Sequence, residues 1–224
     1  MTARQRIRLW TSNQPGAWVM VLSPAVAGVV IGGPTWRNLW LLLAWALCYC
    51  FQFTASRWLL SRRVGRYLPP ALVYGTLVAL VGVPLVVAIP SVLWWAPLFA
   101  ALAGLSLLAA WRRQERSWWA NAVDVLASGT MCLIAVSLGV GGNGVLLPQA
   151  GLVAAAAFML TQYGSVLFVK TMIREFGHHG YYAISVVWHV ALVPLGIWLG
   201  PATGAAAVAL LIRAAILPRR DKRL

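Results

Sequence analysis

The chain has 224 residues, of which 61% are apolar and only 10% are charged, and its mean hydropathy is +0.79. Ordinary soluble domains are about half apolar and about a quarter charged, so this composition excludes that class and predicts an integral membrane protein. Lysine and arginine outnumber aspartate and glutamate by 18 to 4, which leaves a net charge of +14 and excludes any site that needs many carboxylates.

Eight apolar runs are long enough to cross a bilayer, because a spanning helix needs about 20 mostly apolar residues. In chain order they are Ala17 to Gly33, Leu39 to Leu60, Pro70 to Ile89, Val92 to Trp111, Asn121 to Val140, Leu147 to Val169, Tyr181 to Leu199 and Pro201 to Leu217. The first run is longer than the core of a signal peptide and lacks an evident cleavage site, so we expect it to be retained. The predicted fold is an all-α bundle of about eight transmembrane helices.

We expect residues 1–224 to form a single transmembrane domain, with a basic N-terminal segment (1–16) and a basic tail (218–224). Every lysine and arginine except Arg37 and Arg213 lies on alternate connections: before the first run and after the second, fourth, sixth and eighth. The positive-inside rule therefore predicts a multi-pass protein of the bacterial inner (plasma) membrane with both termini in the cytoplasm. Arg213, near the inner end of the last run, is expected to extend to the same surface. Because the charge is explained by orientation, we expect no nucleic-acid partner.

Polar side chains within the runs gather in the predicted cytoplasmic halves, whereas the outer halves consist of Val, Leu, Ala, Gly and Trp. Polar groups are costly in the hydrocarbon core and usually face a cavity or one another, so this pattern predicts a cavity open to the cytoplasm. The candidate catalytic residues are Asp124, Asn121 and His189. The candidate substrate-binding residues are Asn13, Gln14, Gln52, Arg57, Arg62, Gln162, Tyr163, Lys170, Arg174 and Tyr182.

Structural roles compete with these assignments. Asn121 fits the N-cap of the fifth helix, which would place Asp124 in the first turn, at the positive end of the helix dipole. His189 fits a hydrogen bond between helices. Lys170 and Arg174 fit ordinary charge at the inner end of a membrane helix. The sequence leaves both kinds of role open.

Three segments resemble the YwiC-like membrane proteins. They are Asn13 to Met20, followed by Pro24 and Gly28; Arg112 to Ser117, which precedes Asn121; and Val169 to Glu175, which precedes a run with Ser185 and His189. The resemblance covers essentially the whole chain, and it implies a fold more than an activity.

A more distant resemblance is to the UbiA superfamily of intramembrane prenyltransferases. It is carried by the proline-containing first run and by Gln52 and Gln162 near the inner ends of the second and sixth helices. It implies a bundle around a lipid-accessible cavity. Enzymes of that superfamily hold the prenyl diphosphate through Mg²⁺ on aspartate-rich motifs, but here residues 49–67 contain no acid and residues 170–180 contain only Glu175. Because Mg²⁺ prefers carboxylate and phosphate oxygens, we expect no metal site and no cofactor, with Mg²⁺ as the alternative that the resemblance implies.

The sequence thus predicts a protein that binds or processes an isoprenoid or other anionic membrane lipid, such as a polyprenyl phosphate or diphosphate. Arg57, Arg62, Lys170 and Arg174 would contact the phosphate directly, since guanidinium and ammonium groups do so without metal. If the protein is an enzyme, we expect a UbiA-like prenyl or lipid transferase. The alternatives are a transporter of small anions and a non-catalytic subunit that docks a protein partner on its cytoplasmic face.

Overall fold

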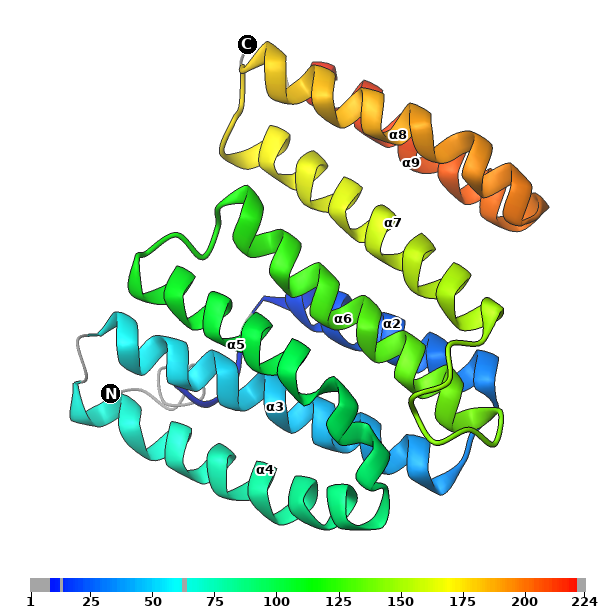
Figure 1. The fold of residues 1–224 in the computed structure, drawn as a ribbon. Helices are drawn as coiled ribbons and strands as arrows, with labels where there is room; N and C mark the ends of the chain where they lie inside the picture. The colour runs from blue at the N-terminus through cyan, green and yellow to red at the C-terminus, as the bar shows by residue number, and fades with distance from the viewer. Residues whose placement is uncertain (1–8, 13, 62–63, 221–224) are drawn as a thin grey trace. The chain divides into compact units, whose positions relative to one another are not determined.

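The structure is a computed structural model that describes residues 9–12, 14–61 and 64–220. All of its long secondary-structure elements are α-helices (Figure 1). The helices are α2 (Pro15–Gly32), α3 (Trp36–Leu60), α4 (Leu68–Ala88), α5 (Ala96–Trp111), α6 (Trp118–Gly139), α7 (Gln149–Ile173), α8 (His179–Leu199) and α9 (Pro201–Arg220). Short 3₁₀ helices, Gly65–Tyr67 and Pro90–Trp95, lead into α4 and α5. Eight helical segments in the described part are long and apolar enough to cross a membrane, which confirms the predicted number and type of elements.

The helices form two compact units, Met1–Met159 and Leu160–Leu224, and α7 continues from the first into the second. The single transmembrane domain stays a prediction, and each unit is described by itself. In the first unit, α6 packs against α2, α3 and α5, while α3 also packs against α2, α4 and α5. Residues 128–138 of α6 are all buried, so α6 is the central helix of this unit. Its core contacts come from Ala25 and Val29 of α2, Leu41 of α3 and Leu85 of α4.

Glycines bring α2 and α6 into close contact. A Cβ atom on Gly32 would lie 2.6 Å from the carbonyl oxygen of Val136, and one on Gly28 would collide with the carbonyl oxygen of Cys132. Gly139 of α6 faces Gly32 in the same way. Gly28 and Gly32 are four residues apart and so share a face of α2, the arrangement with which membrane helices approach backbone to backbone. Neither position tolerates a side chain without separating the two helices.

Side chains of neighbouring helices donate to backbone carbonyls near two helix-interior prolines. Pro24 has no N–H, so α2 lacks the usual hydrogen bond to the carbonyl of Met20. The hydroxyl of Ser128 on α6 donates to that carbonyl at 2.5 Å, and the indole of Trp45 on α3 donates to the next carbonyl, that of Val21, at 2.9 Å. In α4, the carbonyl three residues before Pro84 accepts from the indole of Trp40 at 3.0 Å. The bond from Ser128 satisfies the carbonyl that Pro24 deprives of its helical donor, a group that would be costly in lipid if left unpaired.

The short 3₁₀ helix Gly65–Tyr67 before α4 and the connection at residues 112–117 lie at the same end of the first unit (Figure 1). They carry arginines that include Arg66, Arg112, Arg113 and Arg116, and we call this end the basic end of the unit. In the second unit, α8 and α9 pack together as an antiparallel pair. The end of α7, the connection that follows it and the end of α9 carry Lys170, Arg174 and Arg219, respectively, and they form the basic end of that unit. The side of the membrane that each end faces stays a prediction.

Candidate functional site

A chain of side-chain hydrogen bonds joins three helices of the first unit near its basic end. The Gln52 amide on α3 donates to the Ser106 hydroxyl on α5 at 2.6 Å. That hydroxyl donates in turn to the Asp124 carboxylate on α6 at 3.5 Å. At roughly 1.5 Å per helical residue, the three Cα positions lie about 8 to 12 Å from the nearest helix ends. We call Gln52, Ser106 and Asp124 the α3–α5–α6 cluster.

Two of the three cluster residues were predicted, and Ser106 was not. Gln52 and Asp124 are far apart in the sequence, and Ser106 is what connects them. In the sequence, Ser106 stands out only as the sole polar side chain of α5, a helix otherwise made of apolar residues, glycine and proline. A single hydroxyl in such a helix usually bonds to its own backbone, so nothing in the sequence distinguishes a Ser106 that links two other helices.

The N-cap interpretation of Asn121 and Asp124 is wrong. Helix α6 begins at Trp118, and its N-cap is Ser117, whose hydroxyl accepts from the backbone N–H of Ala120 at 3.2 Å. Asn121 instead donates to the carbonyl of Ser117, one turn earlier, at 2.5 Å. Asp124 therefore lies two turns into α6, beyond the reach of a cap, and the helix dipole falls off within the first turn. Its position is explained by Ser106 rather than by the helix terminus.

Aromatic and N-terminal residues adjoin the cluster. Tyr49 lies on α3, about one turn before Gln52. It hydrogen-bonds to Ser12, and it is close enough to Asp124 for the two charges to interact. The Tyr49 ring meets Trp18 edge to face at 4.9 Å between centroids, and the Trp18 indole donates to the Ser12 carbonyl at 3.1 Å. The backbone N–H of Gln14 donates to the Ser12 hydroxyl at 3.3 Å. Gln14 thus belongs to the surroundings of the cluster through Ser12.

Charges at the basic end act on Asp124 as well. Glu115, in the connection between α5 and α6, is near enough to repel the Asp124 carboxylate. Partial loss of hydration raises the pKa of Glu115 above its ordinary value, while the positive charges of Arg116 and Arg57 oppose that rise. The Arg57 guanidinium stacks over the Phe53 ring at 5.1 Å. The site thus combines two carboxylates with arginines nearer the helix ends.

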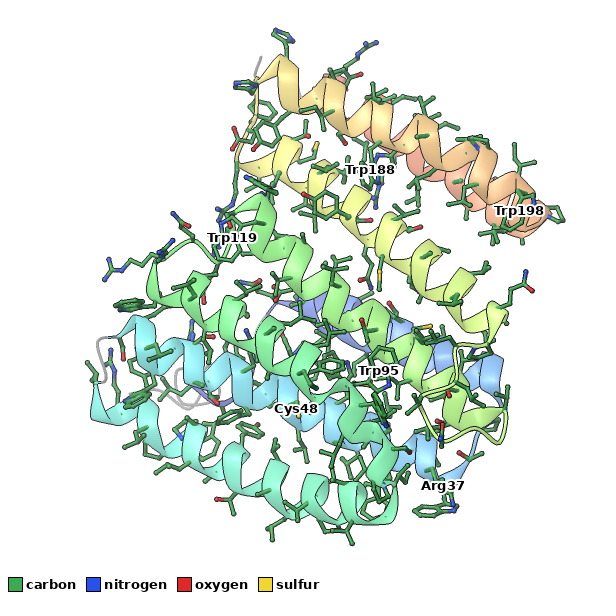
Figure 2. The ribbon with its side chains drawn as sticks, in the orientation of Figure 1. Arg37, Cys48, Trp95, Trp119, Trp188 and Trp198 are labelled. Atoms are coloured by element: carbon green, nitrogen blue, oxygen red, sulfur yellow. The ribbon has the colours of Figure 1, made fainter. Side chains whose placement is uncertain are left out.

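The predicted residues of the second unit fall into separate groups. The Tyr182 hydroxyl donates to the Ala215 carbonyl at 3.0 Å, and Arg219 lies over its ring at 5.3 Å. Tyr163 packs on Trp188 at 5.3 Å, and the Trp188 indole, between α7 and α8 in Figure 2, donates to the Leu160 carbonyl at 2.9 Å. These contacts hold α8 against its two neighbours.

Lys170, Gln162 and His189 are buried, and Arg174 is exposed at the end of α7. The charges nearest to Lys170 are those of Arg174 and Glu175. Asn13 and Arg62 lie outside the described residues.

The extension of Arg213 to the membrane surface stays a prediction. Its guanidinium carbon lies 4.3 Å from the centre of the Phe168 ring, and its Nε and Nη2 atoms are buried without a hydrogen-bond partner. Arg213 also acts electrostatically on His189, which is fully buried on α8. The side chain is partly exposed, and its guanidinium stacks on the Phe168 ring of α7.

The side chains around the α3–α5–α6 cluster can be compared with those that a Mg²⁺ site would need. In the ranges that the structure describes, no three His, Cys, Asp or Glu side chains come together as a metal site would require. Glu115 and Asp124 are the carboxylates of the first unit, and they are accompanied by amide, hydroxyl and guanidinium groups. This set suits hydrogen bonding to an organic molecule with a hydroxyl or phosphate group better than it suits a hard cation.

Comparison with known proteins places the first unit in a family. The family model of YwiC-like proteins matches residues 11–136, a range that contains the whole α3–α5–α6 cluster. A protein of Haemophilus influenzae, named only as an uncharacterized protein, is 24% identical over 187 residues, which cover 82% of this chain and 76% of that protein. No solved structure matches this chain. Because the family match extends over more than half of its length, this multi-pass membrane protein belongs to the YwiC-like family.

Proposed function

We propose that the protein binds an isoprenoid or other anionic lipid at the basic end of its first unit. The observation that carries this proposal is the α3–α5–α6 cluster, in which Asp124 is exposed within a candidate membrane span and bonded through Ser106 to Gln52. Ionisable side chains inside membrane helices are costly and are functional by default. A carboxylate that is exposed and has a hydroxyl partner is available to a ligand from the membrane.

The chemistry around the cluster supports an amphipathic ligand. Leu98 and Leu105 of α5 and Leu126 of α6 are exposed on the same helices as Ser106 and Asp124, and they offer an apolar surface to a hydrocarbon chain. At the basic end, Arg57, Arg112 and Arg116 offer guanidinium groups, which bind phosphate without metal. Asp124 would repel a phosphate, so the phosphate belongs at the arginines and a hydroxyl or other donor of the ligand belongs at Asp124.

An enzymatic form of this proposal is a lipid transferase of the UbiA type. Asp124 would then accept a proton from the reacting hydroxyl, with Ser106 and Gln52 fixing the orientation of the carboxylate. The chain supplies no aspartate-rich motif for a diphosphate–metal complex in residues 49–67, so the arginines would carry the phosphate charge. Binding is the part of the proposal that the cluster supports most directly.

Lipid analysis of the purified protein tests the proposal. The protein is extracted in a mild detergent, and bound lipids are identified by native mass spectrometry for wild type, Asp124→Asn and Ser106→Ala. We expect wild type to carry an anionic lipid enriched over the bulk membrane, and each variant to lose several-fold of its occupancy. Ser91→Ala, at the opposite end of the unit, is the matched control and should retain the lipid. No enrichment in wild type, or equal occupancy in all four proteins, would contradict the proposal.

Transport of a small anion is the second candidate, favoured by the same exposed carboxylate. A membrane aspartate that exchanges a proton couples anion movement to a pH gradient in many transporters. In proteoliposomes, such a protein would take up anion only under a pH gradient, and Asp124→Asn would abolish that dependence. Uptake that is unaffected by Asp124→Asn would exclude this candidate.

A further inference from the structure

Arg213 is a partly exposed cation, one hydrogen-bonding edge of which is buried and unused. One face of its guanidinium is covered by the Phe168 ring at 4.3 Å, but the Nε and Nη2 atoms are buried and have no hydrogen-bond partner. Nε and Nη2 form one of the two edges with which a guanidinium binds two oxygens of an anion at once. Burying such donors without a partner is costly, and the cost is larger in a membrane than in water.

His189 presents a second unused atom beside Arg213. The ring is fully buried, and its Nδ1 lies 2.7 Å from the carbonyl oxygen of Ser185. Because a carbonyl only accepts, Nδ1 carries the hydrogen and donates to it, and Nε2 of the neutral ring is an acceptor. That Nε2 atom is also buried without a partner. Arg213 lies near enough to act on the charge of this ring.

Ser185 and Gly164 complete the surroundings. The Ser185 hydroxyl is buried one turn before His189 and has no partner. Gly164, on α7, lies opposite: a Cβ there would be 3.3 Å from Nε2 of His189 and 2.9 Å from the Trp188 ring. Helices α8 and α9 thus carry unpartnered polar atoms of His189, Ser185 and Arg213, and α7 contributes a residue without a side chain beside His189.

Positive charges outnumber negative ones in the described part of this unit. In the portion of the second unit that the structure describes, Glu175 is the one carboxylate, and it acts on Lys170 at the end of α7. Arg213 therefore has no carboxylate among those residues to compensate its charge. A buried guanidinium edge is stabilised by oxygen acceptors.

We propose that Arg213, His189 and Ser185 bind a singly protonated phosphate, either inorganic phosphate or the monoester headgroup of a lipid. The guanidinium edge requires oxygen acceptors, whereas Nε2 requires a donor, and a protonated phosphate carries both kinds of oxygen. A carboxylate or a sulfate at neutral pH carries acceptors only and leaves Nε2 unsatisfied. A phosphodiester headgroup also lacks the P–OH group. The Ser185 hydroxyl both donates and accepts, so it serves whichever oxygen is nearest.

The test compares anions of similar size on the purified full-length protein in phosphate-free detergent. We expect inorganic phosphate at pH 7 to raise the midpoint of thermal unfolding by several degrees, and sulfate to raise it far less. Equal shifts with both anions would overturn the proposal, because discrimination depends on the phosphate proton. This comparison uses the wild-type protein, so it does not depend on a variant that folds.

A second experiment distinguishes a lipid headgroup from free phosphate as the ligand. The protein is reconstituted in nanodiscs that contain phosphatidic acid, a monoester, or phosphatidylglycerol, a diester, and bound lipid is quantified by native mass spectrometry. Preference for phosphatidic acid with no response to inorganic phosphate would assign the site to a lipid. Response to inorganic phosphate without lipid preference would assign it to the free anion. Absence of both responses, in protein that contains no phosphorus as purified, would overturn the proposal.

Substitutions test whether phosphate binds at Arg213. Arg213→Lys keeps the charge but loses the two-donor edge, and we expect it to weaken phosphate binding at least 10-fold. Arg219→Lys is the matched control, since Arg219 is on the same helix, stacks on Tyr182 and is exposed. Equal loss in both variants would contradict a site at Arg213. Asp124→Asn and Ser106→Ala lie in the first unit and should leave phosphate binding unchanged, so failure of this proposal and failure of the proposed function are distinguishable.

Discussion

Ser106 receives the Gln52 amide and donates to the Asp124 carboxylate, so a single hydroxyl links side chains of α3 and α6 that the sequence places far apart. Its neighbours on α5 are apolar, and the protein offers no second hydroxyl on that helix. Removing it would leave an amide donor and a carboxylate acceptor without their common partner. A residue that does not itself carry charge therefore controls the orientation of the one that does.

For Ser106→Ala we expect the free energy of unfolding in detergent to fall by about 1 kcal/mol, the usual net value of a hydrogen bond. Ser106→Thr keeps the hydroxyl and should lose much less, which separates the hydrogen bond from the change in size. Equilibrium unfolding of the two variants beside wild type measures both effects. An alanine variant as stable as wild type would show that the cluster is not linked through this hydroxyl.

The helices of the first unit are held by backbone features as well as by side chains. Gly28 and Gly32 let α2 approach α6, and Pro24 leaves the Met20 carbonyl to accept from Ser128 of the same partner helix. Both features act on one pair of helices, and that pair contains the central helix of the unit. The contact of α2 with α6 is therefore the element-level interaction on which the position of Asp124 depends.

A methyl group on Gly28 should force α2 and α6 apart, so we expect Gly28→Ala to destabilise the protein by about 1 to 3 kcal/mol, the range for overpacked sites. Gly104→Ala is the matched control. Nothing lies within 4 Å of a Cβ at Gly104, and alanine favours a helix over glycine, so this variant should be as stable as wild type or slightly more stable. Thermal unfolding of both variants decides the matter, and similar losses would argue against close α2–α6 packing.

The role of Pro24 can be separated from that of Ser128 by a double-mutant cycle. Ser128→Ala alone should cost about 1 kcal/mol, because the Met20 carbonyl loses its donor from α6. In a Pro24→Ala background the restored backbone N–H bonds to that carbonyl, so the same serine substitution should cost less. Additive losses in the four unfolding measurements would mean that the hydroxyl and the missing N–H are not connected.

On the scale of the whole molecule, the apolar composition and the alternation of basic connections predict orientation in the membrane. The connection at 112–117 is rich in arginine, whereas the one at 140–148 has no charged side chain. The Ser91 hydroxyl and the Trp95 indole, the latter labelled in Figure 2, bond to the carbonyls of Asn143 and Gly144 and hold that uncharged connection at the other end of the first unit.

Cysteine labelling of intact cells tests this orientation. In a background without Cys48, Cys50 and Cys132, a cysteine that replaces Asn143 should react with a membrane-impermeant maleimide. A cysteine that replaces Gln114 should react only after the cells are opened. The reverse pattern would mean that the basic end faces outward and that the positive-inside rule fails for this protein.

The sequence by itself determined the helices and, through family membership, the kind of protein, because apolar runs of about 20 residues have one stable form in a bilayer. It also identified Gln52, Asp124 and His189 as polar residues in apolar surroundings. It did not show that Ser106 joins the first two, that Ser117 rather than Asn121 caps α6, or that Arg213 stacks on Phe168. Those outcomes depend on which helices are neighbours, and helix contacts in a membrane are set by packing between residues distant in the chain. Periodicity and hydropathy within one segment do not indicate which helices are its neighbours. Only the tertiary structure therefore decided which polar groups are in contact.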